Sequence, residues 1–292
     1  MTGPRVVCAG LLTVDLIHEV DRIPASNEKI IGRAQRLEIG GPATNAARTA
    51  AALGADVLLV APFGESPLTD FVRESLARDG VDWLDAAATQ PNPSPLSTVL
   101  IEPSGDRSVI SSGGIPIPTD WDPGTLLDGA AALLIDGHGG DLPAVMGRGA
   151  GAHGIRVLLD GGSHKAGMTD YLAHVDLALL SADFASPDGS EPLAWALSHS
   201  ASAAARSSGG EPITLRHTDG RTERVPVPAP TAIVDTNGAG DVLHGAALVG
   251  LAREGAAYME ILTFAARVAS RSVEYPGVLG WVGQVPVPQW PQ

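Results

Sequence analysis

The chain has 292 residues, of which 44% are hydrophobic and 18% charged, so it can bury a substantial core and long disordered tracts are not expected. The formal net charge is −14 and no basic run occurs, which argues against a nucleic-acid-binding protein. Cys8 is the only cysteine, which excludes an intramolecular disulfide, and neither a signal peptide nor an apolar run of membrane-spanning length is apparent. A cytoplasmic enzyme that needs no membrane is therefore expected.

The first part of the chain alternates apolar strand-like runs with helix-like segments. Two extended stretches interrupt this rhythm, at about 13–39 and 96–112, and the second contains a hairpin signal around Ser104, Gly105 and Asp106. We interpret these stretches as a small lid sheet. The other elements expected here are strands at 6–12 and 57–61 and helices at 43–53 and 68–78.

The second part of the chain continues the alternation of strands and helices. Strands are expected at 132–135, 157–160, 177–181 and 212–215, helices at 142–152, 192–206, 242–253 and 258–273, and an irregular tail at 285–292. Repeated strand–helix units predict a mostly parallel sheet with helices on both faces. We expect one domain over residues 1–292, with the lid strands as an addition to it.

Residues 235–241 read Asp-Thr-Asn-Gly-Ala-Gly-Asp and lead directly into an apolar helix. Small residues let a ligand approach the backbone, and the unpaired N–H groups at a helix start attract a phosphoryl group. Asp241, just inside the helix, would lie beside that anion site, where a carboxylate suits deprotonation of an attacking hydroxyl. Local physics alone allows an equal alternative, a glycine-rich turn in which Asp241 serves as a cap.

This segment, with the Val-Leu-His-Gly-Ala that follows it, resembles the second signature of the ribokinase-like, or PfkB, carbohydrate kinase family. The first signature is also present: Gly40-Gly41-Pro42-Ala43-Thr44-Asn45-Ala46-Ala47, followed by Gly54 and Gly64. Both lie in the right order, and their form is closest to the ketohexokinase and sulfofructose kinase branch. The resemblance implies a ribokinase-like three-layer α/β sandwich with a mostly parallel central sheet and a small β-strand lid. A Walker A loop is absent from the sequence.

The resemblance also implies site residues. Asp241 would be the catalytic base, and the backbone of Gly238, Ala239 and Gly240 the anion hole. On the sugar side the matching residues are Asp15, Gly41 and Asn45, whose carboxylate and amide suit neighbouring hydroxyls. Without the resemblance, Asp15 would be read as an ordinary strand-end carboxylate and Asn45 as a polar residue on the exposed side of a helix.

Two further residues are candidates for contacts with the substrates. His138 follows a core strand, and the carboxyl ends of parallel strands line the ligand crevice. Arg107, on the hairpin, resembles a family arginine that approaches the phosphates. The competing interpretations are a solvated loop histidine and a surface arginine.

The nucleotide side matches the family less well. The resemblance implies ATP and Mg²⁺, with Thr214, Gly238, Gly240 and Gly277 on the nucleotide side and a monovalent cation such as K⁺ near Asp235 and Asn237. However, Ser181-Ala182-Asp183-Phe184 stands where many members have Asn-x-x-Glu, and Arg216 replaces the usual glycine after Thr214-Leu215. These departures leave the arrangement of the metal open.

The expected function is an ATP-dependent phosphotransferase that acts on a primary hydroxyl of a ketohexose-like or related sugar. A nucleoside kinase on the same fold and a catalytically silent sugar-sensing protein are the alternatives, and the sequence does not name the sugar. Because exposed strand edges pair readily, a homodimer through the lid strands is also expected.

Overall fold

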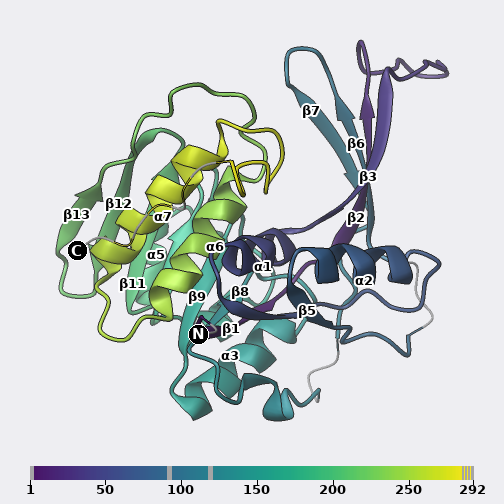
Figure 1. The fold of residues 1–292 in the computed structure, drawn as a ribbon. Helices are drawn as coiled ribbons and strands as arrows, with labels where there is room; N and C mark the ends of the chain where they lie inside the picture. Colours follow the sequence, from purple (N-terminus) through teal and green to yellow (C-terminus); the bar gives the residue numbers. More distant parts are fainter. Residues whose placement is uncertain are drawn as a thin grey trace.

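The protein is built on two separate hydrogen-bonded sheets, seen in a computed structural model that describes residues 3–90, 94–117, 121–284, 286, 288 and 290 (Figure 1). The larger sheet has nine strands in the order β13-β12-β11-β10-β9-β8-β1-β4-β5. Its strands are parallel except for the β11–β12 and β12–β13 pairings. They are β1 Arg5–Ala9, β4 Asp56–Val60, β5 Val81–Leu84, β8 Ala132–Ile135, β9 Arg156–Gly161, β10 Leu177–Leu180, β11 Ala203–Ser208, β12 Glu211–His217 and β13 Thr222–Val225.

Helices cover both faces of this sheet. One face packs against α1 Pro42–Ala52, α2 Thr69–Arg78, α6 Ala239–Leu251 and α7 Tyr258–Ser272, and the other against η1 Gly124–Leu127, α3 Leu142–His153, α4 Met168–Leu172 and α5 Pro192–Ser198. Central strands such as β8 and β10 are buried along their whole length, as parallel strands between two helical layers must be. Two hydrophobic cores result, one on each face, and the expected three-layer arrangement is present.

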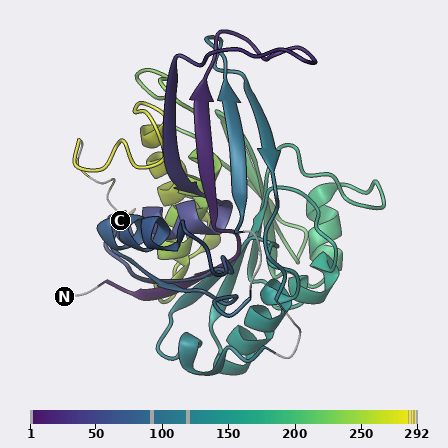
Figure 2. The same ribbon diagram turned by 90° about the vertical axis from the view of Figure 1, so that its right-hand side faces the viewer.

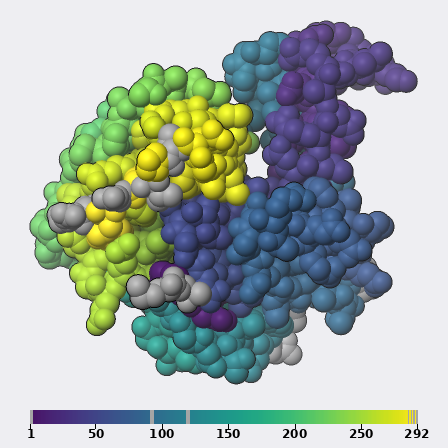
Figure 3. All heavy atoms as spheres, in the orientation of Figure 1, coloured from purple at the N-terminus to yellow at the C-terminus, as the bar shows by residue number. Residues whose placement is uncertain are grey.

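The smaller sheet stands apart as a lid above the main body (Figure 2). Its four strands, β3 Ala34–Gly40, β2 Thr13–Glu19, β6 Leu96–Ile101 and β7 Arg107–Ser111, come from the two stretches predicted to form it. Side chains alternate between its faces, so Asp15 and the residues paired with it, Glu38 and Ser97, share the inner face. Figure 3 shows the hollow between this sheet and the C-terminal part of the body, coloured yellow.

The predicted helix at 192–206 is wrong in its second half. Helix α5 ends at Ser198, and Ser200 has a positive φ of 78°, which helical geometry does not allow. The alanines that follow form β11, buried between β10 and β12. Alanine favours helices, but a fully covered central strand accepts any small apolar residue, so the tertiary environment decided here.

Other expected boundaries moved as well. Within the extended stretch expected at about 13–39, the second strand begins only at Ala34, and strands β5 and β13 were not predicted. The irregular tail predicted at 285–292 lies largely outside the described residues. Within the described part of the chain, no helix combines the length and the apolar character that crossing a membrane requires.

The order of the large sheet places the site. After β1 the chain passes through the lid and α1 to β4, whereas β8 adjoins β1 on the other side. The direction of winding therefore reverses between β1 and β8, which in open parallel sheets is where ligands bind. The backbone N–H of Leu11, after β1, donates to Oδ2 of Asp136, after β8, at 2.8 Å across this point.

Candidate active site

Helices α1 and α6 cross closely enough to bring the two sequence signatures together. A side chain at Gly245 would lie 2.5 Å from the Ala46 carbonyl oxygen and 2.7 Å from Cβ of Thr49. Only a glycine therefore permits this crossing. One turn earlier on α6, the same contact sets Asp241 beside α1.

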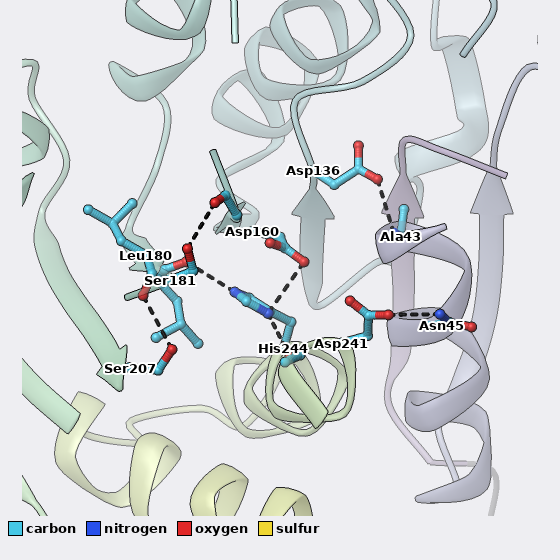
Figure 4. Close-up of polar contacts among 12 residues, drawn as sticks. Ala43, Asn45, Asp136, Asp160, Leu180, Ser181, Ser207, Asp241 and His244 are labelled. Atoms are coloured by element: carbon cyan, nitrogen blue, oxygen red, sulfur yellow. Dashed lines mark hydrogen bonds and ion pairs between the residues drawn. The ribbon is translucent and has the colours of Figure 1, made fainter. Parts of the chain in front are cut away.

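Asp241 is hydrogen-bonded to the first signature. The Asn45 side-chain Nδ2 donates to its Oδ2 at 2.7 Å (Figure 4). Burial, and then the nearby Asp160 carboxylate, raise the pKa of Asp241 to about 7, against the opposing effects of Asn45 and His244. A carboxyl group with a pKa near neutrality is suited to proton transfer.

The loop before α6 has the shape of an anion site. Gly238 lies in the left-handed region at φ 72°, and a Cβ there would lie 2.5 Å from Val278. At Gly240 an added Cβ would meet nothing within 4 Å, so the missing side chain leaves open space at the helix start. Asp235 holds the loop, since its Oδ1 accepts from the Asn237 N–H at 2.8 Å and its Oδ2 from the Gly277 N–H at 2.9 Å.

The N–H groups of the first turn of α6 have no intrahelical acceptor. That of Ala239 contacts the Thr236 carbonyl at a long 3.3 Å, and the first helical bond is from Val242 to Gly238 at 2.8 Å. The exposed Gly240 lies between these two positions. The geometry therefore suits an anion at the positive end of the helix dipole.

Arg48 and Asp79, which the sequence interpretation missed, fix the orientation of Asn45. The Arg48 Nη1 donates to Oδ1 of Asn45 at 3.2 Å, and its Nε donates to Oδ2 of Asp79 at 2.6 Å. With Oδ1 held by a cation, the amide must direct its N–H groups at Asp241. The signal available in the sequence was the i, i+3 spacing of Asn45 and Arg48 on one helix.

A cleft of about 550 Å³ lies between the lid and the body, next to Asp241's partner Asn45. Its wall brings together many of the residues predicted for substrates: from the lid Asp15, Glu38 and Arg107, from the start of α1 Gly41, Asn45 and Arg48, and from the opposite side Asn237 and Gly277. We call it the acceptor cleft. Burial, opposed by hydrogen bonding from Ser97, raises the pKa of Asp15, with Glu38 contributing in the same direction.

Glycines at 40 and 41 allow the backbone to turn tightly around the cleft. A side chain at Gly40 would collide with the Asp15 carboxylate, and one at Gly41, whose φ is 104°, with the Leu11 carbonyl. Thr44 donates its hydroxyl to the same Leu11 carbonyl at 2.8 Å. The predicted signature residues therefore join the first strand, the lid and α1 at one point.

His138 does not line the acceptor cleft but pairs with Asp136. Its Nδ1 lies 3.3 Å from Asp136 Oδ1. Burial lowers the pKa of His138, but the Asp136 carboxylate has the larger effect, so the pKa is raised above its usual value. Its predicted contact with the substrate stays a prediction.

Asp136, two residues before His138, is buried and braces the site through its side chain. Its Oδ2 accepts from the N–H groups of Leu11 at 2.8 Å and Ala43 at 3.0 Å, and its Oδ1 from that of His138 at 2.9 Å. Burial would raise the pKa of Asp136, but these bonds and His138 lower it below its usual value. The ionised carboxylate thus ties the ends of β1 and β8 to the start of α1.

A second, apolar cavity of about 300 Å³ lies beyond the start of α6. Thr236, Ala239 and Gly240 form its inner end, and Ile213, Val227, Leu243, Ala266 and Ala269 are among its other walls. We call it the nucleotide-side cavity, because Gly240, which the resemblance places on the nucleotide side, is part of its wall. Two residues expected on the nucleotide side are not part of its wall. Thr214 falls on the face of β12 opposite to Ile213, and Gly277 lines the acceptor cleft.

The segment that departs from Asn-x-x-Glu is held by main-chain contacts. Arg206 donates from Nε to the Ser181 carbonyl at 3.4 Å and from Nη2 to that of Ala182. The Ser181 hydroxyl donates to the Gly162 carbonyl at 2.8 Å, and Asp183 is exposed. Among the described residues, no group of three or more His, Cys, Asp or Glu side chains could hold a metal ion.

These features define a class of protein: an α/β protein with a lidded acceptor cleft, an apolar cavity, and a carboxylate beside a helix-start anion site between them. The model of the pfkB family carbohydrate kinases matches residues 4–280, so the chain belongs to this family. The family resemblance, the ribokinase-like fold and the expectation of a carbohydrate kinase are confirmed.

Among curated relatives, an ATP-dependent ribose-1-phosphate kinase of Halopiger xanaduensis is 28% identical over 38% of this chain. The ketohexokinase of Mus musculus is 26% identical, also over 38% of the chain. The matches span only 38% and 37% of those two proteins. The structure of Arabidopsis thaliana ribokinase complexed with ribose and ATP aligns with a TM-score of 0.79 at 22% identity, covering 97% of this chain and 96% of that one.

Proposed function

We propose that the protein is an ATP-dependent kinase that phosphorylates a primary hydroxyl of a neutral sugar, with Asp241 as the general base. One observation carries the proposal: Asp241, with a pKa raised to about 7, is hydrogen-bonded to Asn45 in the wall of the acceptor cleft and lies in the first turn of α6, whose residues Ala239 and Gly240 line the nucleotide-side cavity. Membership in a carbohydrate kinase family supports the same reaction.

The acceptor cleft favours a polyol. Its wall carries the carboxylates of Asp15 and Glu38 and the amide of Asn45, which can accept and donate to neighbouring hydroxyls. Two cations also line the cleft: the charge of Arg48 is already offset by Asp79 at 2.6 Å, and Arg107 shares the lid wall with the two carboxylates of Asp15 and Glu38. An uncharged, hydroxyl-rich acceptor such as a ketohexose or pentose therefore suits the cleft better than an anionic one.

In the reaction, the acceptor hydroxyl lies beside Asp241, which takes its proton as the oxygen attacks the γ-phosphorus of ATP. The bond from that phosphorus to the β,γ-bridging oxygen breaks, and ADP leaves. The N–H groups around Gly238, Ala239 and Gly240 stabilise the charge on the transferred phosphoryl group. Closure of the lid over the cleft would exclude water, which is a competing acceptor.

Mg²⁺ and K⁺ would be held in different ways. Because the described residues offer no side-chain cluster for a metal, Mg²⁺ would enter bound to the phosphates of ATP rather than to a protein cage. Asp235, predicted near a monovalent cation, already accepts two backbone N–H groups, so its observed task is to shape the loop. K⁺ binding beside Asp235 and Asn237 stays a prediction.

The test is ATP consumption with a panel of pentoses, hexoses, ketohexoses and nucleosides, in wild type and Asp241→Asn. Turnover of a sugar that falls at least a thousandfold in the variant, with both ligands still bound by calorimetry, supports the proposal. Nucleoside turnover would change the acceptor class, and binding of a sugar without turnover would favour a sensor. Turnover of Asp241→Asn within tenfold of wild type would refute the assignment of Asp241 as the general base.

We also propose that the protein forms a homodimer through the outer face of the lid. The register places Leu37, Leu16, Thr98 and Ile110 in one row across the four strands, and Leu37 and Ile110 are 44% and 73% exposed. An exposed apolar row on a free sheet favours association. Light scattering should give a dimer for the wild type and a monomer for a Leu37→Glu/Ile110→Glu variant; a monomeric wild type at micromolar concentration refutes it.

A further inference from the structure

His244 is buried directly behind the proposed base. It lies one turn after Asp241 on α6, is 5% exposed, and points to the ends of β9 and β10 (Figure 4). Its Nδ1 is 2.8 Å from the Gly240 carbonyl oxygen and 3.3 Å from Oδ2 of Asp160, and its Nε2 is 3.0 Å from the Leu179 carbonyl oxygen.

The surroundings of the ring fix the number of protons that the pair holds. A backbone carbonyl only accepts, so Nε2 must carry a proton for Leu179. If Nδ1 and Asp160 were both unprotonated, a ring lone pair would face two acceptors in a buried place, which is costly. One further proton must therefore lie on Nδ1 or on Asp160, and in either case His244 and Asp160 together carry no net charge.

This neutrality matters because Asp241 is surrounded by acidic groups. From β8 and β9 the groups that act on it are Asp136, with its partner His138, and Asp160, while α1 contributes the Asn45 hydrogen bond. Lys165 in turn faces His138. Each of the two buried carboxylates thus has an imidazole partner. An unpartnered Asp160 would repel the ionised form of Asp241.

We infer that Asp160 and His244 are positioning residues, a net-neutral, proton-sharing pair that keeps the Asp241 carboxylate ionised and directed at the acceptor hydroxyl. The inference rests on the proposed function of Asp241 as base. The pair itself touches no substrate and passes no proton to it. Asp160 lies in β9, one residue beyond the partner of Ile135 in β8, and His244 follows Asp241 by three residues, so the fold brings the pair together from β9 and α6.

The kinetic test uses His244→Gln, which is neutral and leaves Asp160 uncompensated. The acidic limb of kcat/KM against pH should move up by about one pH unit, so that activity falls about tenfold below the limb and recovers above it. Adding Asp160→Asn should return the limb to its wild-type place. His199→Gln, which removes a histidine bonded to Trp195 away from the site, is the matched control.

A purely structural role for His244 predicts something different: an equal loss at every pH, which the second substitution does not restore. That outcome, or an unmoved limb in His244→Gln, overturns the inference. Thermal unfolding of each variant identifies a loss that comes from misfolding.

A readout that needs no activity separates this inference from the proposed function. The ring ¹⁵N signals of His244, assigned by their absence in His244→Gln, should show a proton on Nε2 in the wild type, and the Nδ1 signal should shift when Asp160→Asn removes the carboxylate beside it. An unprotonated Nε2 in the wild type, or an Nδ1 signal that Asp160→Asn does not shift, overturns the inference, whether or not kinase activity exists. The expected signals in a protein without kinase activity would count against the proposed function alone.

Discussion

The amide of Asn45 and the carboxylate of Asp241 meet at 2.7 Å although 196 residues separate them in the chain. This bond lowers the pKa of Asp241 against the effect of burial. Asn45→Leu should therefore raise that pKa further, so that less of the base is ionised at neutral pH. We expect kcat/KM to fall about a hundredfold at pH 7 and to recover partly at pH 9. Equal losses at both pH values would contradict this explanation.

Asp241 should make the folded protein less stable as the pH rises. Its folded pKa of about 7 exceeds the ordinary value of 3.8. The stabilising contribution of the protonated group is therefore complete below pH 3.8 and is lost as the pH rises through the folded pKa of about 7. Asp241→Asn cannot ionise and should raise the free energy of unfolding by up to about 4 kcal/mol at pH 8, with little effect at pH 4. Urea unfolding at the two pH values measures this; a larger gain at pH 4 would disprove it.

Arg48 should affect binding of the acceptor more than the chemical step. Arg48→Leu frees Oδ1 of Asn45 and leaves Asp79 without its partner at 2.6 Å. The KM for the sugar should rise about tenfold, since a misaligned amide loses roughly one hydrogen bond, while the KM for ATP stays constant. Arg73→Leu removes an exposed ion pair with Asp70 on α2 and serves as the control. Equal changes in both KM values would argue for a general disturbance.

Gly245 should tolerate no side chain. Gly245→Val would force α1 and α6 apart at Ala46 and Thr49, costing about 1–3 kcal/mol of stability and separating Asn45 from Asp241. At Gly151, on α3, an added Cβ would lie 3.5 Å from His174, an ordinary contact, so Gly151→Ala should leave stability within about 1 kcal/mol. Thermal unfolding and activity of the two variants compare them directly. Wild-type activity in Gly245→Val would show that the crossing does not set the site.

The nucleotide-side cavity can be tested by filling it. Ala269, half-buried on α7, is part of its wall, and Ala269→Phe would occupy much of the approximately 300 Å³. The KM for ATP should rise at least tenfold while that for the sugar changes little. If the sugar KM rises instead, the assignment of the two pockets is reversed.

The local patterns predicted the core of the fold well. The apolar runs at β8, β10 and α6 formed the strands and the helix expected there, and the two signatures lie side by side on α1 and α6. The helix expected through residues 203–206 failed because alanine there is buried between neighbouring strands, a fact of the sheet order and not of the local sequence.

The site was only partly predictable, for a related reason. Asp241 and Asn45 lie in motifs, whereas Asp160 and His244 owe their contact to β9 ending beneath α6, and Arg48 owes its function to Asp79 on a different element. Such pairs depend on distances between elements, which a single sequence does not contain.

Among the described residues, the lid strands pair only with one another and not with the large sheet. The lid residues that line the acceptor cleft, such as Asp15, Glu38 and Arg107, therefore belong to a separate hydrogen-bonded unit from Asp241, Asp160 and His244. Under the proposed function, substitutions in the lid can change which acceptor is bound, while Asp241 and the residues around it stay the same. Directed evolution of new acceptors should accordingly start from libraries confined to the inner face of the lid.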